Sequence, residues 1–337
     1  MLARIAQYVP GRAGKLFVAT TADVWSLYGE KVTAGLAGRE CKALFFPGGE
    51  ATKRFEHVEA LAEQMVEAGA DRSSIVMALG GGIANDMGGF LASVFMRGVP
   101  VIQIPTTLLA QVDAAIGGKT GVNLTSGKNL IGAFYQPLAV LIDPEVLRTL
   151  PEREFRAGLF EVVKYGVISS PELFELLARR SDEVLSQSPD ALDRIISESV
   201  RIKAEVVSAD EKESDLRRIL NFGHTVGHAL EAETRYERFL HGEAVAFGIN
   251  AATELAALVG LLDVSSRDSI RNTVSLYGPI PSLEGIRPEA LFRRLISDKK
   301  TIQGKVHFVL PERIGSVRVV SGVDDKHVYN AIQAALA

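Results

Sequence analysis

The chain has 337 residues, with 37 Lys and Arg against 41 Asp and Glu, a formal net charge of −4 and a pI of about 6.0. This balance offers no basic field for nucleic acid or for anionic lipid, which excludes those two classes of partner. Cys41 is the only cysteine, which excludes an intrachain disulfide framework and fits a reducing compartment.

No segment has the composition of a signal peptide, and no stretch reaches the roughly 18 apolar residues of a membrane span. With 47% hydrophobic and 23% charged residues, the composition is ordinary for a soluble globular enzyme. We therefore expect a cytoplasmic enzyme, and the length favours two domains.

The first part of the chain alternates short apolar runs with segments of helical spacing. The runs are rich in Val, Ile, Leu and Phe and are bounded by Gly, Pro or Thr, which is typical of buried strands. Such alternation predicts a Rossmann-like α/β domain with a mostly parallel sheet and helices on both faces. The expected strands are residues 15–20, 41–47, 74–82, 99–107 and 138–143.

After Pro151 the pattern changes to long amphipathic stretches, which predict a mainly α-helical second domain. The boundary near 144–151 gives an α/β domain over residues 1–150 and a helical domain over residues 151–337. Residues 305–311 and 315–321 are expected to form a small late hairpin. The expected helical stretches are 152–168, 171–187, 190–208, 221–234, 241–260 and 288–298.

A glycine cluster, Gly80-Gly81-Gly82, leads from an expected strand into a helical run that contains Asp86. Glycines at such a place let phosphates approach the backbone and the following helix N-terminus. The cluster differs from the G-x-G-x-x-G fingerprint, and a plain tight turn with Asp86 as a helix cap explains it as well. Because Pro105-Thr106-Thr107 ends another strand, the combination favours a nucleotide site at the carboxyl ends of the sheet.

Histidines gather in the second domain: His224 and His228 are four residues apart, and His241 opens the next apolar helix. Together with Glu161 they offer the Glu and His donors of a catalytic metal site, for which zinc is suitable and other divalent ions remain alternatives. A single histidine on a mixed helix is more often a surface or core residue, and Glu161 with Lys164 fits a surface ion pair equally well. Spacing alone leaves His228 open as a metal ligand or a substrate contact.

Polar and cationic residues also gather in residues 111–136, which carry several glycines. A surface loop is one explanation, but the apolar residues Ile116, Val122, Leu124 and Ile131 indicate partial burial. Lysines above glycine backbone suit phosphate or carboxylate binding. The cations expected to meet an anionic substrate include Lys119, Lys128, Lys203, Arg217, Arg218, Lys299 and Lys300.

Taken together and in chain order, these motifs resemble the 3-dehydroquinate synthase family, within the wider sugar phosphate cyclases. No one motif is decisive, but the ordered set spans nearly the whole chain. The matching stretches are residues 49–53, 80–98, 105–123, 127–134, 158–166, 217–231, 241–248 and 298–300.

The resemblance implies an NAD-binding first domain, a metal-binding helical second domain and an active site in the cleft between them. It implies a divalent metal, zinc or cobalt, held by Glu161, His224 and His241, with His228 transferring protons on the substrate side. It implies that Asp113, Lys119, Lys164, Lys203 and Asn129 contact the substrate's hydroxyl and carboxylate region. The phosphate contacts would be Arg97, Asn221, Arg217 and Lys299 or Lys300, and the NAD-lining residues Glu50, Lys53, Gly81, Gly82, Asp86, Thr106, Thr107, Asp113, Lys119, Lys128 and Thr149.

The implied reaction converts 3-deoxy-D-arabino-heptulosonate 7-phosphate to 3-dehydroquinate and phosphate, with NAD unchanged overall. Arg97 is expected to reach the site of a partner subunit, which implies a homodimer. Two departures from the family pattern, Leu124-Thr125-Ser126 after GVN and Ala114-Ala115, weaken the exact substrate assignment. The alternatives are a sister cyclase with another sugar phosphate, a polyol or glycerol dehydrogenase of the iron-type group, and a non-catalytic nucleotide-binding protein.

Overall fold

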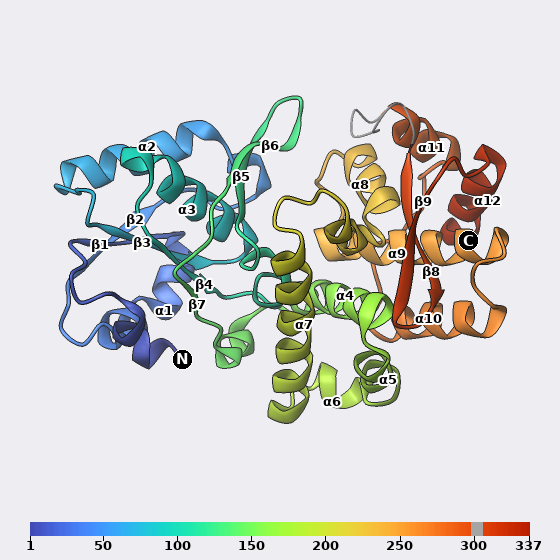
Figure 1. Cartoon of the computed structure of the whole chain (residues 1–337), viewed down its shortest axis with the longest axis horizontal. Helices are drawn as coiled ribbons and strands as arrows, with labels where there is room; N and C mark the ends of the chain where they lie inside the picture. The colour runs from blue at the N-terminus through green and yellow to red at the C-terminus, as the bar shows by residue number, and fades with distance from the viewer. Residues whose placement is uncertain (298–305) are drawn as a thin grey trace. The chain divides into compact units, whose positions relative to one another are not determined.

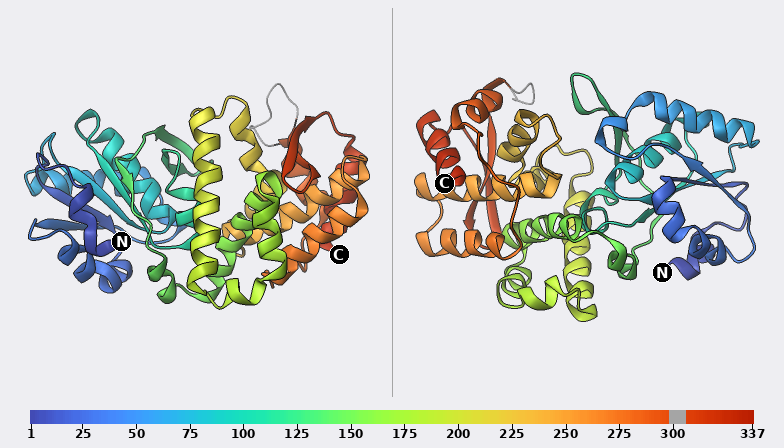
Figure 2. Two further views of the ribbon diagram at one scale, coloured as in Figure 1. Left: turned by 60° about the horizontal axis from the view of Figure 1, so that its bottom comes forward. Right: turned by 180° about the vertical axis from the view of Figure 1, so that it is seen from behind.

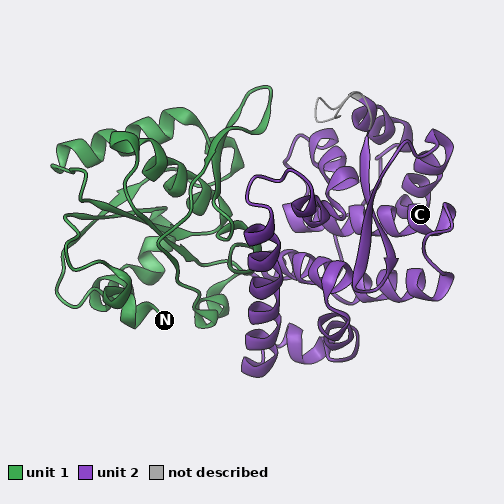
Figure 3. Ribbon diagram, in the orientation of Figure 1, with its two compact units in different colours: residues 1–150 green, residues 151–337 purple. Residues whose placement is uncertain are grey.

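The computed structural model describes residues 1–297 and 306–337 of the chain. Contacts divide it into two compact units, Met1–Leu150 and Pro151–Ala337 (Figure 3). Among the described residues, no helix combines the length and the apolar character needed to cross a membrane.

Unit 1 is built on a five-stranded parallel sheet, which confirms the predicted α/β fold class. The strand order is β2-β1-β3-β4-β7 (Figure 1). The central strands β1, β3 and β4 are buried along their whole length, and this accounts for their continuous apolar sequences. The strands are β1 (Leu16–Thr20), β2 (Cys41–Phe45), β3 (Ile75–Gly80), β4 (Val101–Pro105) and β7 (Ala139–Val140).

Helices cover both faces of this sheet. Leu16 and Val18 of β1 pack into one core cluster with η1 (Leu2–Tyr8), α1 (Ala22–Gly35) and η5 (Pro144–Thr149). Phe17 and Ala19 face the opposite cluster with α2 (Phe55–Glu67) and α3 (Gly82–Val94). In the sheet, β2 lies next to β1 on one edge and β3 lies next to β1 on the other. The order of the strands therefore reverses its direction between β1 and β3. Ligands of open α/β sheets bind outside the carboxyl ends of the strands at such a point.

A hairpin that the sequence did not predict follows the short π-helix η4 (Ala110–Ala114). It consists of β5 (Lys119–Leu124) and β6 (Gly127–Phe134), which pair antiparallel and project from unit 1 in Figure 1. The two strands approach closely at Gly121 and Gly132, where an added Cβ would lie 2.5 and 2.1 Å from carbonyl oxygens of the opposite strand. Gly121 and Gly132 therefore serve hairpin packing, and the surface-loop explanation is wrong for most of this segment.

Unit 2 is mainly helical, as predicted, and α9 packs against α4, α8, α10, α12 and the hairpin β8–β9 (Figure 2). The expected late hairpin is confirmed by β8 (His307–Arg313) and β9 (Ser316–Ser321). The stretch 171–187 forms two helices that separate at Arg180, and two further helices, α10 and α12, were not predicted. The helices are α4 (Glu152–Ser169), α5 (Pro171–Arg179), α6 (Ser181–Leu185), α7 (Pro189–Ala209), α8 (His224–Glu233), α9 (His241–Leu258), α10 (Val264–Leu276), α11 (Pro288–Ser297) and α12 (Asp325–Leu336).

Candidate functional site

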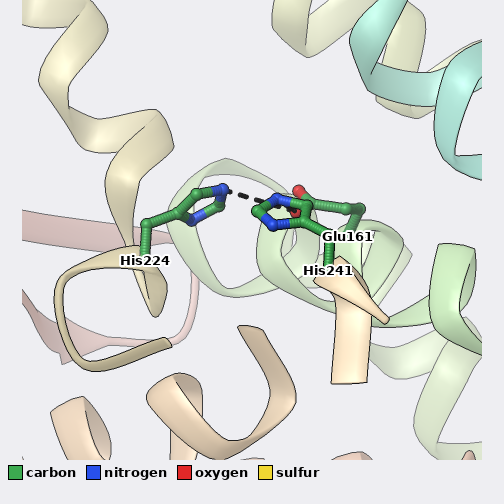
Figure 4. Close-up of side chains that lie close together, drawn as sticks. All are labelled: Glu161, His224 and His241. Atoms are coloured by element: carbon green, nitrogen blue, oxygen red, sulfur yellow. Dashed lines mark ion pairs between the residues drawn. The ribbon is translucent and has the colours of Figure 1, made fainter. Parts of the chain in front are cut away.

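Three side chains of unit 2, Glu161, His224 and His241, converge as Figure 4 shows. Glu161 lies in the middle of α4, while His224 and His241 are the first residues of α8 and α9. The left-handed Gly223, with φ of 79°, precedes His224 and sets the start of its helix. The carboxylate of Glu243 accepts a hydrogen bond from the backbone N–H of Leu240 at 2.7 Å and fixes the start of α9.

The two histidines present the same ring atom to the same carboxylate oxygen. Nε2 of His224 and Nε2 of His241 each lie 3.5 Å from Oε1 of Glu161. The Glu161 side chain is fully buried, and the His224 side chain is only 11% exposed. Two nitrogen donors and one carboxylate oxygen that converge in this way match the three protein ligands of a catalytic zinc ion. The residues present therefore fit a divalent metal.

The local electrostatics differ between the two histidines. Burial lowers the pKa of His224 to about 4, and the nearby charges of Lys164 and His241 act in the same direction. Burial also acts to lower the pKa of His241, but hydrogen bonds to the carboxylates of Glu161 and Glu231 outweigh it and raise that pKa to about 10. The carboxylates of Glu161 and Glu231 thus favour a positive charge on or beside the His241 ring. A bound metal ion would supply such a charge.

Two further side chains of α8 lie beside this cluster. The ring centroid of His228 is 5.4 Å from that of His224 and 5.8 Å from that of His241. Glu231, one turn later, has its Oε2 3.4 Å from Nδ1 of His241 and 3.9 Å from Nε2 of His228. His228, Glu231 and His241 therefore form a second group of donors with metal-like spacing.

Unit 2 buries three cationic side chains, one of which contacts a predicted metal ligand. Lys164 forms an ion pair with Glu161 one turn before it, and both side chains are buried, so the surface-pair explanation is wrong. Lys203 on α7 is 5% exposed and Arg217 is 1% exposed. Nη1 of Arg217 donates to the carbonyl oxygen of Glu211 at 2.5 Å. Buried positive charges are costly unless they are compensated, and Lys164 is compensated by the carboxylate of Glu161.

The loop between α7 and α8 is held by a carboxylate that the sequence analysis did not single out. Asp210 accepts hydrogen bonds from the backbone N–H groups of Ser214, Asp215 and Arg217 at 2.8 to 3.0 Å. These bonds keep the pKa of Asp210 well below its usual range. Nδ2 of Asn221 donates to Oε1 of Glu213 in the same loop at 2.7 Å. Asp210 therefore shapes the loop that carries Arg217.

In unit 1 the glycine turn lies at the carboxyl edge of the sheet. Gly80 ends β3 with φ of 148°, and the backbone N–H of Thr106 donates to its carbonyl oxygen at 2.9 Å. Gly81 is the N-cap of α3, and an added Cβ there would lie 3.0 Å from Cγ2 of Thr107. The structure thus brings Gly81, Gly82, Thr106 and Thr107 to one place at the N-terminus of α3, where backbone N–H groups favour phosphate.

A polar network in unit 1 joins residues far apart in the sequence. Lys53, which is 3% exposed, forms an ion pair with Asp86 and donates to Oδ1 of Asn129 at 2.6 Å. Lys128 lies 3.8 Å from Oε1 of Glu50. These five predicted residues therefore gather in one network between α3, the β5–β6 hairpin and η2 (Glu50–Thr52).

Asn123, which lies in the polar segment 111–136 and was given no role from the sequence, is central to this network. Its Nδ2 donates to Oε1 of Glu50 at 2.7 Å, and its Oδ1 accepts from the backbone N–H of Asn129 at 2.8 Å. Asn129 has a φ of 54°, in the left-handed region that asparagine tolerates. The available signal was the position of Asn123 between the apolar residues Val122 and Leu124, since a buried amide there needs partners.

The other predicted residues of unit 1 lie on several different elements. Thr149 is exposed, and its hydroxyl is hydrogen-bonded to that of Tyr28 and to the carbonyl oxygen of Val146. Arg97 is exposed at the end of η3 (Phe95–Arg97) with φ of 70°. Asp113 lies half-buried in η4, and Lys119 is exposed at the start of β5. Lys299 and Lys300 lie outside the described residues.

Comparison with known proteins identifies the family. The family model described as 3-dehydroquinate synthase N-terminal matches residues 43–157, and the one described as 3-dehydroquinate synthase C-terminal matches residues 158–301. The chain belongs to the 3-dehydroquinate synthase family. A member of this family from Solibacter usitatus (strain Ellin6076), named 3-dehydroquinate synthase, is 61% identical over 337 residues, which are 100% of this chain and 94% of that protein.

Solved structures place this member of the 3-dehydroquinate synthase family among sugar phosphate cyclases. A 2-epi-5-epi-valiolone synthase from Streptomyces hygroscopicus subsp. jinggangensis 5008, with NAD+ and Zn2+ bound, is 32% identical with a TM-score of 0.91, covering 99% of this chain and 94% of that one. A 2-deoxy-scyllo-inosose synthase complexed with carbaglucose-6-phosphate, NAD+ and Co2+ is 27% identical with a TM-score of 0.87, covering 98% and 94%.

Proposed function

We propose that this chain converts 3-deoxy-D-arabino-heptulosonate 7-phosphate to 3-dehydroquinate and phosphate, as a carbon–oxygen lyase that uses NAD and a divalent metal. The observation that carries the proposal is the convergence of Glu161, His224 and His241 beside His228 in a unit that also buries Lys164 and Arg217. The 61% identity to a protein named 3-dehydroquinate synthase supports this choice of reaction.

We assign the two units different tasks. Unit 2 would hold the metal through Glu161, His224 and His241, and zinc or cobalt fits these donors. When bound there, the metal would act as a Lewis acid on hydroxyl and carbonyl oxygens of the substrate. Glu161 would provide a fully buried ligand from α4, and the first residues of α8 and α9 would provide the two histidine ligands.

Unit 1 would hold NAD at the carboxyl edge of its sheet. The glycine turn and the N-terminus of α3 would bind the phosphates, while the network around Lys53 would fix the loops at the edge. NAD bound there would supply reversible hydride transfer at a ring carbon that bears a hydroxyl. The ketone formed by loss of that hydride and of the hydroxyl proton would acidify the neighbouring C–H, so that its proton and then phosphate can leave before the hydride is returned. The assigned residues are Glu50, Lys53, Gly81, Gly82, Asp86, Thr106, Thr107, Asp113, Lys119, Lys128 and Thr149.

The remaining polar residues would bind and orient the substrate. His228 is assigned to proton transfer, since its ring lies beside the two ligand histidines and its side chain is 37% exposed. The hydroxyl and carboxylate groups would be held by Lys164, Lys203, Lys119, Asp113 and Asn129, and the positive charges of the three lysines suit an anionic substrate. Arg97, Arg217, Asn221 and one of Lys299 and Lys300 would hold the phosphate.

The proposal includes a cytoplasmic homodimer, in which the exposed Arg97 of one subunit serves the partner's site. A variant Arg97→Ala with unchanged NAD and metal binding but weaker substrate binding would support this assignment. Mixing Arg97→Ala subunits with inactive His241→Ala subunits tests it directly at a substrate concentration too low for Arg97→Ala to turn over, because a shared site restores part of the activity in the mixed dimer. No recovery in a proven mixed dimer would contradict the exchange of Arg97.

Incubation of the purified protein with the heptulosonate phosphate, NAD and zinc tests the reaction. We expect phosphate release in proportion to substrate with no net NADH, and 3-dehydroquinate as the product. Net NADH from a polyol would instead support a dehydrogenase. Phosphate release only from a different sugar phosphate would support a sister cyclase, which the TM-score of 0.91 to a valiolone synthase makes the second candidate.

A further inference from the structure

Glu231 is a buried carboxylate next to the predicted metal ligands, with no role among the residues assigned above. It lies near the end of α8, one turn after His228, and is 2% exposed. Its Oε2 is 3.4 Å from Nδ1 of His241, within hydrogen-bonding distance, and 3.9 Å from Nε2 of His228. A buried carboxylate is costly unless it is paired, so its place between two histidines calls for a physical explanation.

The ring orientations of the two ligand histidines give this explanation. Nδ1 of His224 lies 3.0 Å from the carbonyl oxygen of Phe222, and Nδ1 of His241 lies 3.4 Å from Oε2 of Glu231. Both acceptors require a protonated Nδ1, and a neutral imidazole then keeps its lone pair on Nε2. In both histidines Nε2 is the atom that lies 3.5 Å from Glu161. The two outer acceptors therefore select the tautomer that metal binding at Glu161 requires.

The spacing of the donors also allows a competing arrangement. His228, Glu231 and His241 form a second group with metal-like spacing, and it shares His241 with the first. A neutral imidazole has one lone pair, so His241 cannot accept a metal on Nε2 and another on Nδ1 without losing its remaining proton. The first group presents two histidine nitrogens at equal distance from one fully buried oxygen, whereas the second has unequal distances of 3.4 and 3.9 Å.

We propose that Glu231 is a positioning residue of the metal centre, which accepts the Nδ1 proton of His241 and directs its Nε2 toward the metal. The proposal rests on the metal role assigned to Glu161, His224 and His241. Carboxylates that accept from a ligating histidine raise its basicity and fix its ring, and their loss typically costs about 10- to 100-fold in metal affinity. Glu231 would thereby act on the metal without touching it.

The test compares Glu231→Leu, which removes the acceptor at similar volume, with Glu231→Gln, whose amide oxygen still accepts from Nδ1. Glu254→Leu is the matched control, because Glu254 is also buried at 6% exposure but pairs with Arg271 and Arg267. Zinc and cobalt affinities are measured by competition with a chromophoric chelator, together with the visible spectrum of the cobalt-loaded protein.

We expect Glu231→Leu to bind metal about 10- to 100-fold more weakly than wild type, with one metal per chain at saturation and an unchanged type of cobalt spectrum. Glu231→Gln should stay close to wild type, and so should Glu254→Leu. Wild-type affinity in Glu231→Leu would overturn the proposal. A cobalt spectrum with one ligand fewer, or a second metal lost in this variant, would make Glu231 a ligand and overturn it equally.

If the Glu231→Leu variant fails to fold, a measurement on the unmodified protein still tests the proposal. In zinc-loaded protein with 15N-labelled histidine, the shifts of His241 should show Nδ1 protonated and Nε2 bound to metal. The opposite assignment would overturn the role of Glu231. Absence of metal binding by wild type would instead refute the proposed metal centre itself, so the two failures are distinguishable.

Discussion

Lys164 forms an ion pair with Glu161 one turn earlier in α4, and their side chains are only 1% and 0% exposed. Two charges in such a place have lost most of their hydration, so each depends on the other for compensation. Glu161 also faces two histidine nitrogens, so a metal ion would supply a second source of positive charge for the same carboxylate.

Replacement of Lys164 by methionine should therefore destabilise the metal-free protein strongly. Removal of one partner of a buried pair costs about 3–5 kcal/mol, because the other charge is left uncompensated. Zinc should restore more stability to Lys164→Met than it adds to wild type. Urea unfolding with and without zinc measures both effects. Arg179→Met is the control, since the exposed Arg179–Glu175 pair should contribute about 1 kcal/mol or less. Equal zinc stabilisation of both proteins would contradict this coupling.

Substitution of His241 by alanine should remove bound metal and catalytic activity together. His241 provides one of three converging donors, and its ring is also the point at which Glu231 acts. Metal content after dialysis and phosphate release from the heptulosonate phosphate are the two measurements. His327→Ala on α12 serves as the control, because His327 belongs to neither donor group. Full activity with wild-type metal content would refute the assignment of His241 as a ligand.

Much of the fold could be predicted because the spacing of apolar residues along the chain reflects which side of each strand or helix is buried. The strands β1, β3 and β4 are apolar throughout, and α4, α7 and α9 follow helical spacing over several turns. The β5–β6 hairpin was missed because its alternation is interrupted by Gly121, Gly127 and Gly132, and close packing of the two strands requires glycine at Gly121 and Gly132. Periodicity also missed α10, whose mixed sequence buries only Ile270, Thr273 and Val274.

The candidate site was predictable to the extent that its residues stand in recognisable motifs. His224, His228 and His241 were found from their spacing, and the structure brings their rings within 6 Å of one another. Glu231 and Asp210 were not found, because an acidic residue on a helix or in a loop has no sequence mark that distinguishes a buried carboxylate from a solvated one. Their contacts depend on tertiary packing that spacing does not encode.

Substitution of Asn123 should weaken NAD binding, because Asn123 holds Glu50 and Asn129 in place. Asn123→Asp keeps an oxygen for the N–H of Asn129 but places a second oxygen against Oε1 of Glu50, where the amide donates at 2.7 Å. Two facing carboxylates repel, so we expect weaker NAD binding, by roughly tenfold for a loss of about 1.4 kcal/mol. Isothermal titration with NAD measures the change, and metal content should be unaffected. Thr125→Ala, in the exposed hairpin turn, is the control. Unchanged NAD affinity in Asn123→Asp would show that the network has no part in cofactor binding.

Asp210 should make the loop before α8 sensitive to acid. Backbone N–H groups of Asp215, Arg217 and Ser214 lower the pKa of its carboxyl in the folded protein. A group whose pKa is lowered by folding contributes stability above its unfolded pKa of about 3.9, and this contribution is lost as the pH falls through the lower folded value. The free energy of unfolding of Asp210→Asn should therefore lie below that of wild type at pH 7, and the difference should shrink as the pH falls below about 4.

Urea unfolding of both proteins across this range measures the difference, and Asp193→Asn, at an exposed position of α7, controls for the loss of one negative charge. Because Asp210 also holds the backbone N–H of Arg217 at 3.0 Å, the variant should bind substrate phosphate more weakly and raise KM more than it lowers kcat. A stability difference that stays constant from pH 7 to the acid limit would mean that the charge of Asp210 is not what holds the loop.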